Sequence, residues 1–113
     1  MSDTWMYRDA TWTEGYDLVG YDVEATDGSI GKIDEATNEA AGSYLVVDTG
    51  FWIFGKKRLI PAGVVSRVDH DSMKVYVNLT KERIKSAPDY DRDTWGDDSR
   101  TRHSDYYGTY VTP

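Results

Sequence analysis

The chain has no cysteine, only three prolines and no long hydrophobic run. Without cysteine it can form no disulfide, thiolate metal site or cysteine nucleophile, so its stability must come from packing. No window approaches the roughly 18 apolar residues of a membrane-spanning helix, and the opening sequence MSDTWMYRDATW lacks the basic and apolar regions of an export signal. We therefore expect a cytoplasmic protein.

Positive charge is also scarce, with 13 Lys and Arg against 20 Asp and Glu and a net charge of -7. Such an acidic chain is repelled by phosphate backbones and anionic lipid heads, which disfavours nucleic acid as a partner. Aromatic residues and glycine are plentiful instead: four Trp, nine Tyr, two Phe and ten Gly among 113 residues. This composition favours short strands and tight turns in a single domain.

Alternation of apolar and polar residues predicts a first hairpin. The apolar positions of its first strand are Val19, Tyr21, Val23 and Ala25, within residues 17–26. Asp27 and Gly28 follow, and Asp-Gly supplies the positive φ angles of a tight hairpin turn. The return strand, 29–37, carries Gly31, which predicts a bulge or a sharp bend of a barrel wall.

The densest apolar sequence, residues 45–65, predicts two strands joined by an aromatic loop. Residues 44–47 are continuously apolar, which predicts burial on both faces, or on one face with a partner covering the other. Leu59 and Ile60 form the next short strand, which Pro61 ends or places at an edge because it has no N–H to donate.

A second hairpin is predicted over residues 64–79, with a turn at His70–Ser72. Its last strand directs Val75, Val77 and Leu79 inward. Thr80 is a helix N-cap candidate, with a short helix that ends before Pro88.

Together these elements predict an all-β fold, a small closed or partly open β-barrel of five to six short strands with a short C-terminal helical turn and flexible tails. The barrel would span residues 17–90. Residues 1–16 would form an aromatic-rich leader, in which Trp12 and Tyr16 could pack on the barrel or on a partner. Residues 91–113 would form an acidic aromatic tail without regular structure.

Several segments carry a family resemblance through their order and spacing. They are Leu18-Val19-Gly20, Val23, Asp27-Gly28, Ile30-Gly31-Lys32-Ile33, Tyr44-Leu45-Val46-Val47, Leu59-Ile60-Pro61, Val75-Tyr76-Val77 and Ala87-Pro88. The region they cover resembles the PRC-barrel family, the small barrel of the photosynthetic reaction-centre H subunit and of the bacterial ribosome maturation factor. The resemblance implies a stand-alone bacterial accessory or assembly module, dimeric and without catalytic activity.

Catalytic chemistry would need convergent groups, and the sequence offers few. Asp69, His70 and Asp71 could bind a metal only awkwardly, because adjacent strand residues point to opposite faces. A carboxylate-rich strand surface is also present, but nothing orients it for acid–base chemistry; its members are Asp17, Asp22, Glu24, Asp34 and Glu35. We therefore expect no enzyme activity, no catalytic residue, no metal and no cofactor.

Interaction is the better expectation, and the candidate residues are Phe51, Trp52, Ile53, Phe54, Tyr44, Trp95, Tyr106 and Tyr107. The apolar loop 51–54 could plug the core, form a self-association or partner interface, or, with the bases 56–58, touch a membrane weakly or a nucleic acid. The leading hypothesis is a self-associating assembly module, a homodimer whose tails recruit an unidentified protein client. Two alternatives follow the resemblance: a soluble accessory of photosynthetic or other membrane electron transfer, or a ribosome-assembly accessory that acts through protein contacts.

Overall fold

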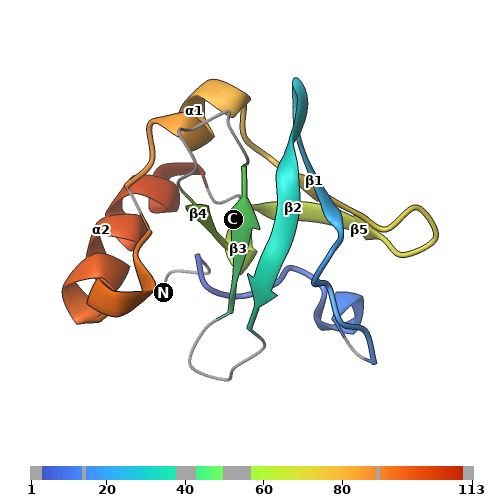
Figure 1. Ribbon diagram of the computed structural model, residues 1–113, viewed down its shortest axis with the longest axis horizontal. Helices are drawn as coiled ribbons and strands as arrows, with labels where there is room; N and C mark the ends of the chain where they lie inside the picture. Colours follow the sequence, from blue (N-terminus) through green and yellow to red (C-terminus); the bar gives the residue numbers. More distant parts are fainter. Residues whose placement is uncertain (1–3, 14, 38–42, 50–56, 89, 111–113) are drawn as a thin grey trace.

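The body of the protein is one six-stranded mixed sheet, with helix α2 beside its β4 edge (Figure 1). The computed structural model describes residues 4–13, 15–37, 43–49, 57–88 and 90–110. The strands are β1 Asp22–Ala25, β2 Gly28–Ala36, β3 Tyr44–Asp48, β4 Lys57–Pro61, β5 Val65–Asp69 and β6 Lys74–Val77. The helices are α1 Lys81–Lys85 and α2 Asp97–Tyr107, with short 3-10 turns η1 Ala10–Trp12, η2 Ala62–Val64, η3 Arg92–Thr94 and η4 Gly108–Tyr110.

The strand order is β4-β3-β2-β1-β6-β5, in which β1 and β6 run parallel and the other neighbours antiparallel. The outer strands β4 and β5 do not pair in the part of the chain that the structure describes, so hydrogen bonds do not close the sheet. The predicted small, partly open barrel of five to six strands is confirmed. None of the described helices has the length and apolar character needed to cross a membrane.

Gly31 forms the predicted bend in β2. Val23 pairs with Gly31 while Glu24 pairs with Ser29, so Ile30 is the extra residue of a bulge. Gly31 has a φ of 146°, and a Cβ built there would lie 2.1 Å from the main-chain oxygen of Asp48. Only glycine fits this close approach of β2 to β3.

The predicted alternation is wrong at Val19, which is exposed, whereas Leu18 is buried. The chain turns here instead of extending, because Gly20 has a φ of 92° and the Tyr21 N–H donates to the Leu18 carbonyl oxygen at 3.1 Å. The strand therefore begins only at Asp22.

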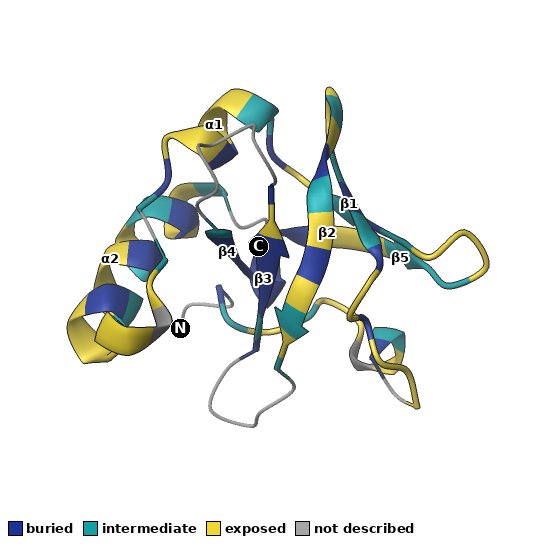
Figure 2. Ribbon diagram, viewed as in Figure 1, coloured by how far each residue is buried: buried dark blue, intermediate teal, exposed yellow. Residues whose placement is uncertain are grey.

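Strand β3 lies in the middle of the core, where Leu45, Val46 and Val47 are completely buried (Figure 2). Successive strand residues point to opposite faces, so the sheet is covered on both sides here. Of the two predicted arrangements, burial on both faces is therefore the one observed. The covering comes from the chain itself.

Helix α1 begins as predicted. The Thr80 side chain accepts a hydrogen bond from the Arg83 N–H at 3.3 Å, and the helix ends at Lys85, before Pro88. The Asp27 carboxylate accepts the Lys81 N–H at 2.9 Å, which ties the β1–β2 turn to the start of α1. Ile84 is the residue that α1 buries in the core.

Both flanking segments pack on the sheet. Trp12 contacts the core, which is one of the two arrangements expected for it, and Tyr7 does so as well. The sequence predicts no regular structure in residues 91–113, whereas the structure has α2 over Asp97–Tyr107. The buried face of α2 is Ser99, His103 and Tyr107, at a spacing of four, and two of these residues are polar. A search for apolar periodicity therefore misses this helix.

Candidate interaction surface

An aromatic cluster forms where the N-terminal segment, β3 and the residues before α2 meet. Its members are Trp5, Tyr44, Tyr90 and Trp95. Ring centroids lie 6.1 Å apart for Trp5 and Tyr44, 5.5 Å for Tyr44 and Trp95, and 5.6 Å for Tyr90 and Trp95. Such edge-on and tilted pairs stabilise by about 0.5–1.5 kcal/mol each beyond the area they bury.

Trp5 fixes the N-terminal segment to both β3 and α2. Its indole N–H donates to the Ser104 hydroxyl at 2.7 Å, and the Arg100 guanidinium lies 4.5 Å from its ring centroid. Its main-chain oxygen accepts the Ser43 N–H at 2.7 Å, beside the start of β3. The two ends of the chain are thus joined through one side chain.

His103 and Tyr107 lie beneath this cluster. The His103 Nδ1–H donates to the Ser99 carbonyl oxygen at 2.7 Å, and its ring contacts Trp95 edge-on with centroids 5.3 Å apart. Burial lowers the pKa of His103 and raises that of Tyr107 above its ordinary range. Tyr107 donates its hydroxyl hydrogen to the Leu59 carbonyl oxygen at 2.8 Å.

Tyr106 links the same helix to α1. Its hydroxyl donates to the Arg83 carbonyl oxygen, and the Arg83 guanidinium lies 4.8 Å from the ring centroid of Tyr110. Tyr106 and Tyr110 also contact each other, with centroids 5.8 Å apart.

The structure thus brings the predicted interaction residues Tyr44, Trp95, Tyr106 and Tyr107 together around one helix. Tyr44, Trp95 and Tyr106 are half-buried, and Tyr107 is completely buried, so the contacts of Tyr107 in this conformation are with its own chain. The predicted loop residues Phe51, Trp52, Ile53 and Phe54 lie outside the described residues.

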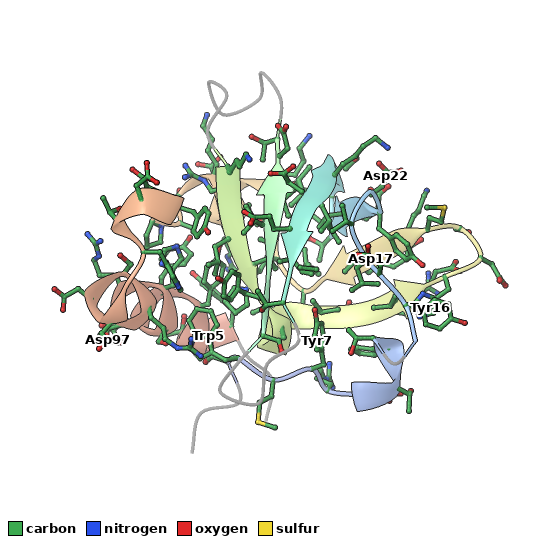
Figure 3. The ribbon with its side chains drawn as sticks, turned by 60° about the horizontal axis from the view of Figure 1, so that its bottom comes forward. Trp5, Tyr7, Tyr16, Asp17, Asp22 and Asp97 are labelled. Atoms are coloured by element: carbon green, nitrogen blue, oxygen red, sulfur yellow. The ribbon has the colours of Figure 1, made fainter. Side chains whose placement is uncertain are left out.

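A second surface lies beyond the other end of the sheet, and of its residues only Tyr16 was named from the sequence as a contact with the barrel or a partner. We call it the Tyr16 face; it comprises the Tyr16–His70 stack and the exposed residues Val19 and Met73 of the two segments that this stack joins. The Tyr16 ring stacks on the His70 imidazole with centroids 3.5 Å apart and planes within 10°. Figure 3 labels Tyr16. Tyr16, Val19 and Met73 are 53%, 46% and 51% exposed. Large apolar side chains this open are uncommon in the described chain, which makes this face a candidate for contact with a partner.

His70 is held on a second side as well. Its Nδ1 lies 2.9 Å from the Tyr21 hydroxyl, and the Met73 N–H donates to its main-chain oxygen at 3.3 Å. The sequence predicted only a solvated turn here. The stack joins residues 54 positions apart, so no local pattern could have indicated it.

An open hollow adjoins the Tyr16 face. It has a volume of about 490 Å³ and is lined by Tyr16, Arg67, Val68, Asp69, His70 and Asp71. The Asp69 carboxylate accepts the Ser72 N–H at 3.2 Å, which lowers the pKa of this carboxyl, with a smaller contribution from Arg67. Among the described residues, no group of three His, Asp or Glu side chains is placed to hold a metal ion.

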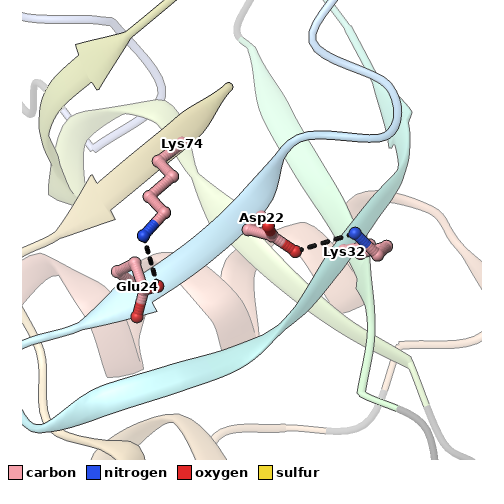
Figure 4. Close-up of polar contacts among 4 residues, drawn as sticks. All are labelled: Asp22, Glu24, Lys32 and Lys74. Atoms are coloured by element: carbon pink, nitrogen blue, oxygen red, sulfur yellow. Dashed lines mark hydrogen bonds and ion pairs between the residues drawn. The ribbon is translucent and has the colours of Figure 1, made fainter. Parts of the chain in front are cut away.

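The carboxylates of β1 are engaged in ion pairs (Figure 4). Asp22 lies 2.9 Å from the Lys32 ammonium and Glu24 lies 3.6 Å from that of Lys74. Asp34 is likewise paired with Lys57. These exposed pairs contribute little stability, but they neutralise the strand surface and leave no free acid–base pair among these three carboxylates.

Among solved structures, the chain is similar to a putative 16S ribosomal RNA processing protein, RimM, from Pseudomonas aeruginosa, with 21% identity and a TM-score of 0.49. The match covers 61% of this chain and 46% of that chain, so this protein spans less than half of the solved one, and the likeness concerns the fold alone. No curated protein matches. A family model described as the PRC-barrel domain matches residues 14–84, which is more than half of the chain, and the protein therefore belongs to the PRC-barrel domain family.

Proposed function

We propose that this protein is a non-catalytic interaction module of the cytoplasm that assembles with protein partners, first of all with a second copy of itself. The observation that carries the proposal is the uneven exposure of its large aromatic and aliphatic side chains. One group of aromatic side chains, around Trp5 and Tyr44, packs on the chain itself. The Tyr16 face, in contrast, leaves three large apolar side chains exposed to solvent. Exposed apolar area on a small acidic domain is stabilised when a partner covers it.

The described histidines support a role without catalysis. His103 is buried and donates to a main-chain oxygen, and His70 contacts the rings and hydroxyl of tyrosines. Neither contact pairs an imidazole with a carboxylate or an aliphatic hydroxyl, as a general base in a catalytic triad would require.

A role in membrane electron transfer would be favoured by buried carboxylates with raised pKa values. No Asp or Glu is buried in the described part of the chain. Hydrogen bonds from neighbouring residues lower the pKa of two described carboxyls, Asp9 and Asp69. This alternative therefore has no supporting observation here.

Self-association is assigned to the barrel and to residues 51–54, whose sequence Phe-Trp-Ile-Phe joins β3 to β4. The test compares the light-scattering mass of the native chain with that of a triple variant, Phe51→Ser, Trp52→Ser and Phe54→Ser. A matched control, Met6→Ser, removes an exposed apolar side chain elsewhere.

A native dimer that becomes a folded monomer only in the triple variant supports the proposal. A native chain that is monomeric at all concentrations contradicts self-association. A folded triple variant that stays dimeric contradicts the assignment to these residues.

A further inference from the structure

We infer that the Tyr16 face binds an arginine side chain presented, next to an apolar residue, by a partner protein. The inference rests on the proposed interaction role, but it uses residues other than 51–54 and names the chemistry of the partner.

The first argument is the rigid stack. One face of the Tyr16 ring lies on His70, and 53% of the residue is exposed to solvent. His70 is itself fixed by Tyr21, so the pair forms a preorganised flat surface. A planar guanidinium stacks on such a surface with little loss of conformational freedom.

The second argument is charge. Asp69 and Asp71 line the hollow beside Tyr16. Asp17 follows Tyr16 directly in the chain, and both are labelled in Figure 3. Within the described part of the chain these three carboxylates form no ion pair, unlike Asp22 and Glu24. Arg67 is close enough to help lower the pKa of Asp69, but three carboxylates against one guanidinium leave net negative charge around an aromatic ring, which complements a cation.

The basic residue of the hollow, Arg67, offsets only part of this charge. The Arg67 guanidinium lies 4.3 Å from the ring centroid of Tyr76, a half-buried residue of β6. The pair also shows, within this protein, the guanidinium-on-tyrosine contact that we assign to the partner's arginine and Tyr16.

The third argument is the apolar surround. Val19 lies three residues after Tyr16, and Met73 follows His70 in the same turn, so both exposed side chains belong to segments that the stack joins. Apolar side chains beside the arginine of a partner would cover them. Methionine suits such a contact because its unbranched side chain adapts to different shapes.

The test is an NMR titration of the full chain with the acetylated and amidated peptide Gly-Leu-Arg-Leu-Gly. We expect the Met73 and Val19 methyl signals to shift, with a dissociation constant on the order of 1 mM. The matched Lys peptide should bind about threefold more weakly because ammonium does not stack, and the Glu peptide should not bind.

Two pairs of variants locate the site. Tyr16→Ser should weaken binding of the Arg peptide about fivefold, whereas Tyr16→Phe should retain it. Asp71→Lys should weaken binding about tenfold, and Asp105→Lys, the same charge change on an exposed residue of α2, should have little effect.

Equal weakening by Asp71→Lys and Asp105→Lys would show only a general charge effect and overturn the inference. Preference for Lys over Arg, or shifts confined to residues elsewhere, would also overturn it. If no peptide binds while the native chain is a dimer, this inference fails and the proposed function stands. If the native chain is a monomer but the Arg peptide binds as predicted, self-association fails and the inference stands.

Discussion

The hydroxyl of Tyr107 donates a hydrogen bond to the carbonyl oxygen of Leu59, 2.8 Å away, and so joins α2 to the edge strand β4. Both residues are completely buried. An edge strand presents unpaired main-chain groups, and this bond satisfies one of them from within the chain.

Replacement of Tyr107 by Phe should destabilise the protein by about 1–2 kcal/mol, because the Leu59 oxygen would stay buried without this partner. Tyr107→Ala should cost about 3–5 kcal/mol, since it also leaves a cavity. Urea unfolding measures both. Tyr110→Phe is the matched control, and a similar loss in that variant would show that the buried bond has no special importance.

Stability should fall as the pH drops, because of His103. Burial lowers its pKa in the folded state, so below the ordinary value of about 6.5 the unfolded chain binds a proton that the folded chain does not. The stability gained by keeping His103 neutral is complete above this ordinary pKa. Below it, the free energy of unfolding falls by up to about 1.4 kcal/mol per pH unit until the pH reaches the lowered pKa of the folded state.

The measurement is urea unfolding at pH 7.5 and 5.5. The His103→Gln variant should lose part of the difference in unfolding free energy between the two pH values. Identical pH dependence in the native chain and His103→Gln would contradict the assignment.

Gly31→Ala should destabilise the fold by more than about 2 kcal/mol, through a methyl group placed against the Asp48 main chain and an unfavourable positive φ. At Gly96 a Cβ would meet nothing within 4 Å, so Gly96→Ala is the control. Thermal unfolding of the two variants should therefore give clearly separated midpoints. Equal midpoints would mean that the β2 bend tolerates a side chain.

Thr80→Ala should cost about 1 kcal/mol, because the Arg83 N–H would lose its capping oxygen at the start of α1. Thr80→Asp should restore most of that loss, since a carboxylate accepts the same bond and lies at the positive end of the helix dipole. The free energy of unfolding in urea distinguishes the three proteins. No recovery in the Asp variant would argue against capping as the cause.

The elements that follow local rules could be predicted from the sequence. Thr80 caps a helix, Asp27-Gly28 turns a hairpin and Val75 and Val77 point inward, because each outcome depends on near neighbours in the chain. The prediction that Val19 points inward was wrong because Gly20 has a positive φ, which no neighbouring residue indicates. The sequence alone cannot show whether a glycine uses its conformational freedom.

The candidate surfaces depend on contacts between distant residues, and this is why only part of them was predicted. Tyr44 and Trp95 were predicted as interaction residues because they are aromatic. Their packing beside α2 depends on the buried residues Ser99 and His103, which are polar and so give the helix no periodic apolar pattern. The Tyr16–His70 stack requires the N-terminal segment to reach the β5–β6 turn. No spacing in the sequence encodes this tertiary contact.

The most direct test of the central claim is sedimentation equilibrium of the intact protein over a concentration series from about 5 to 200 μM, near neutral pH. Self-association predicts a mass that rises with concentration toward twice the 12.8 kDa of the single chain. A mass that stays at 12.8 kDa throughout the series would contradict it.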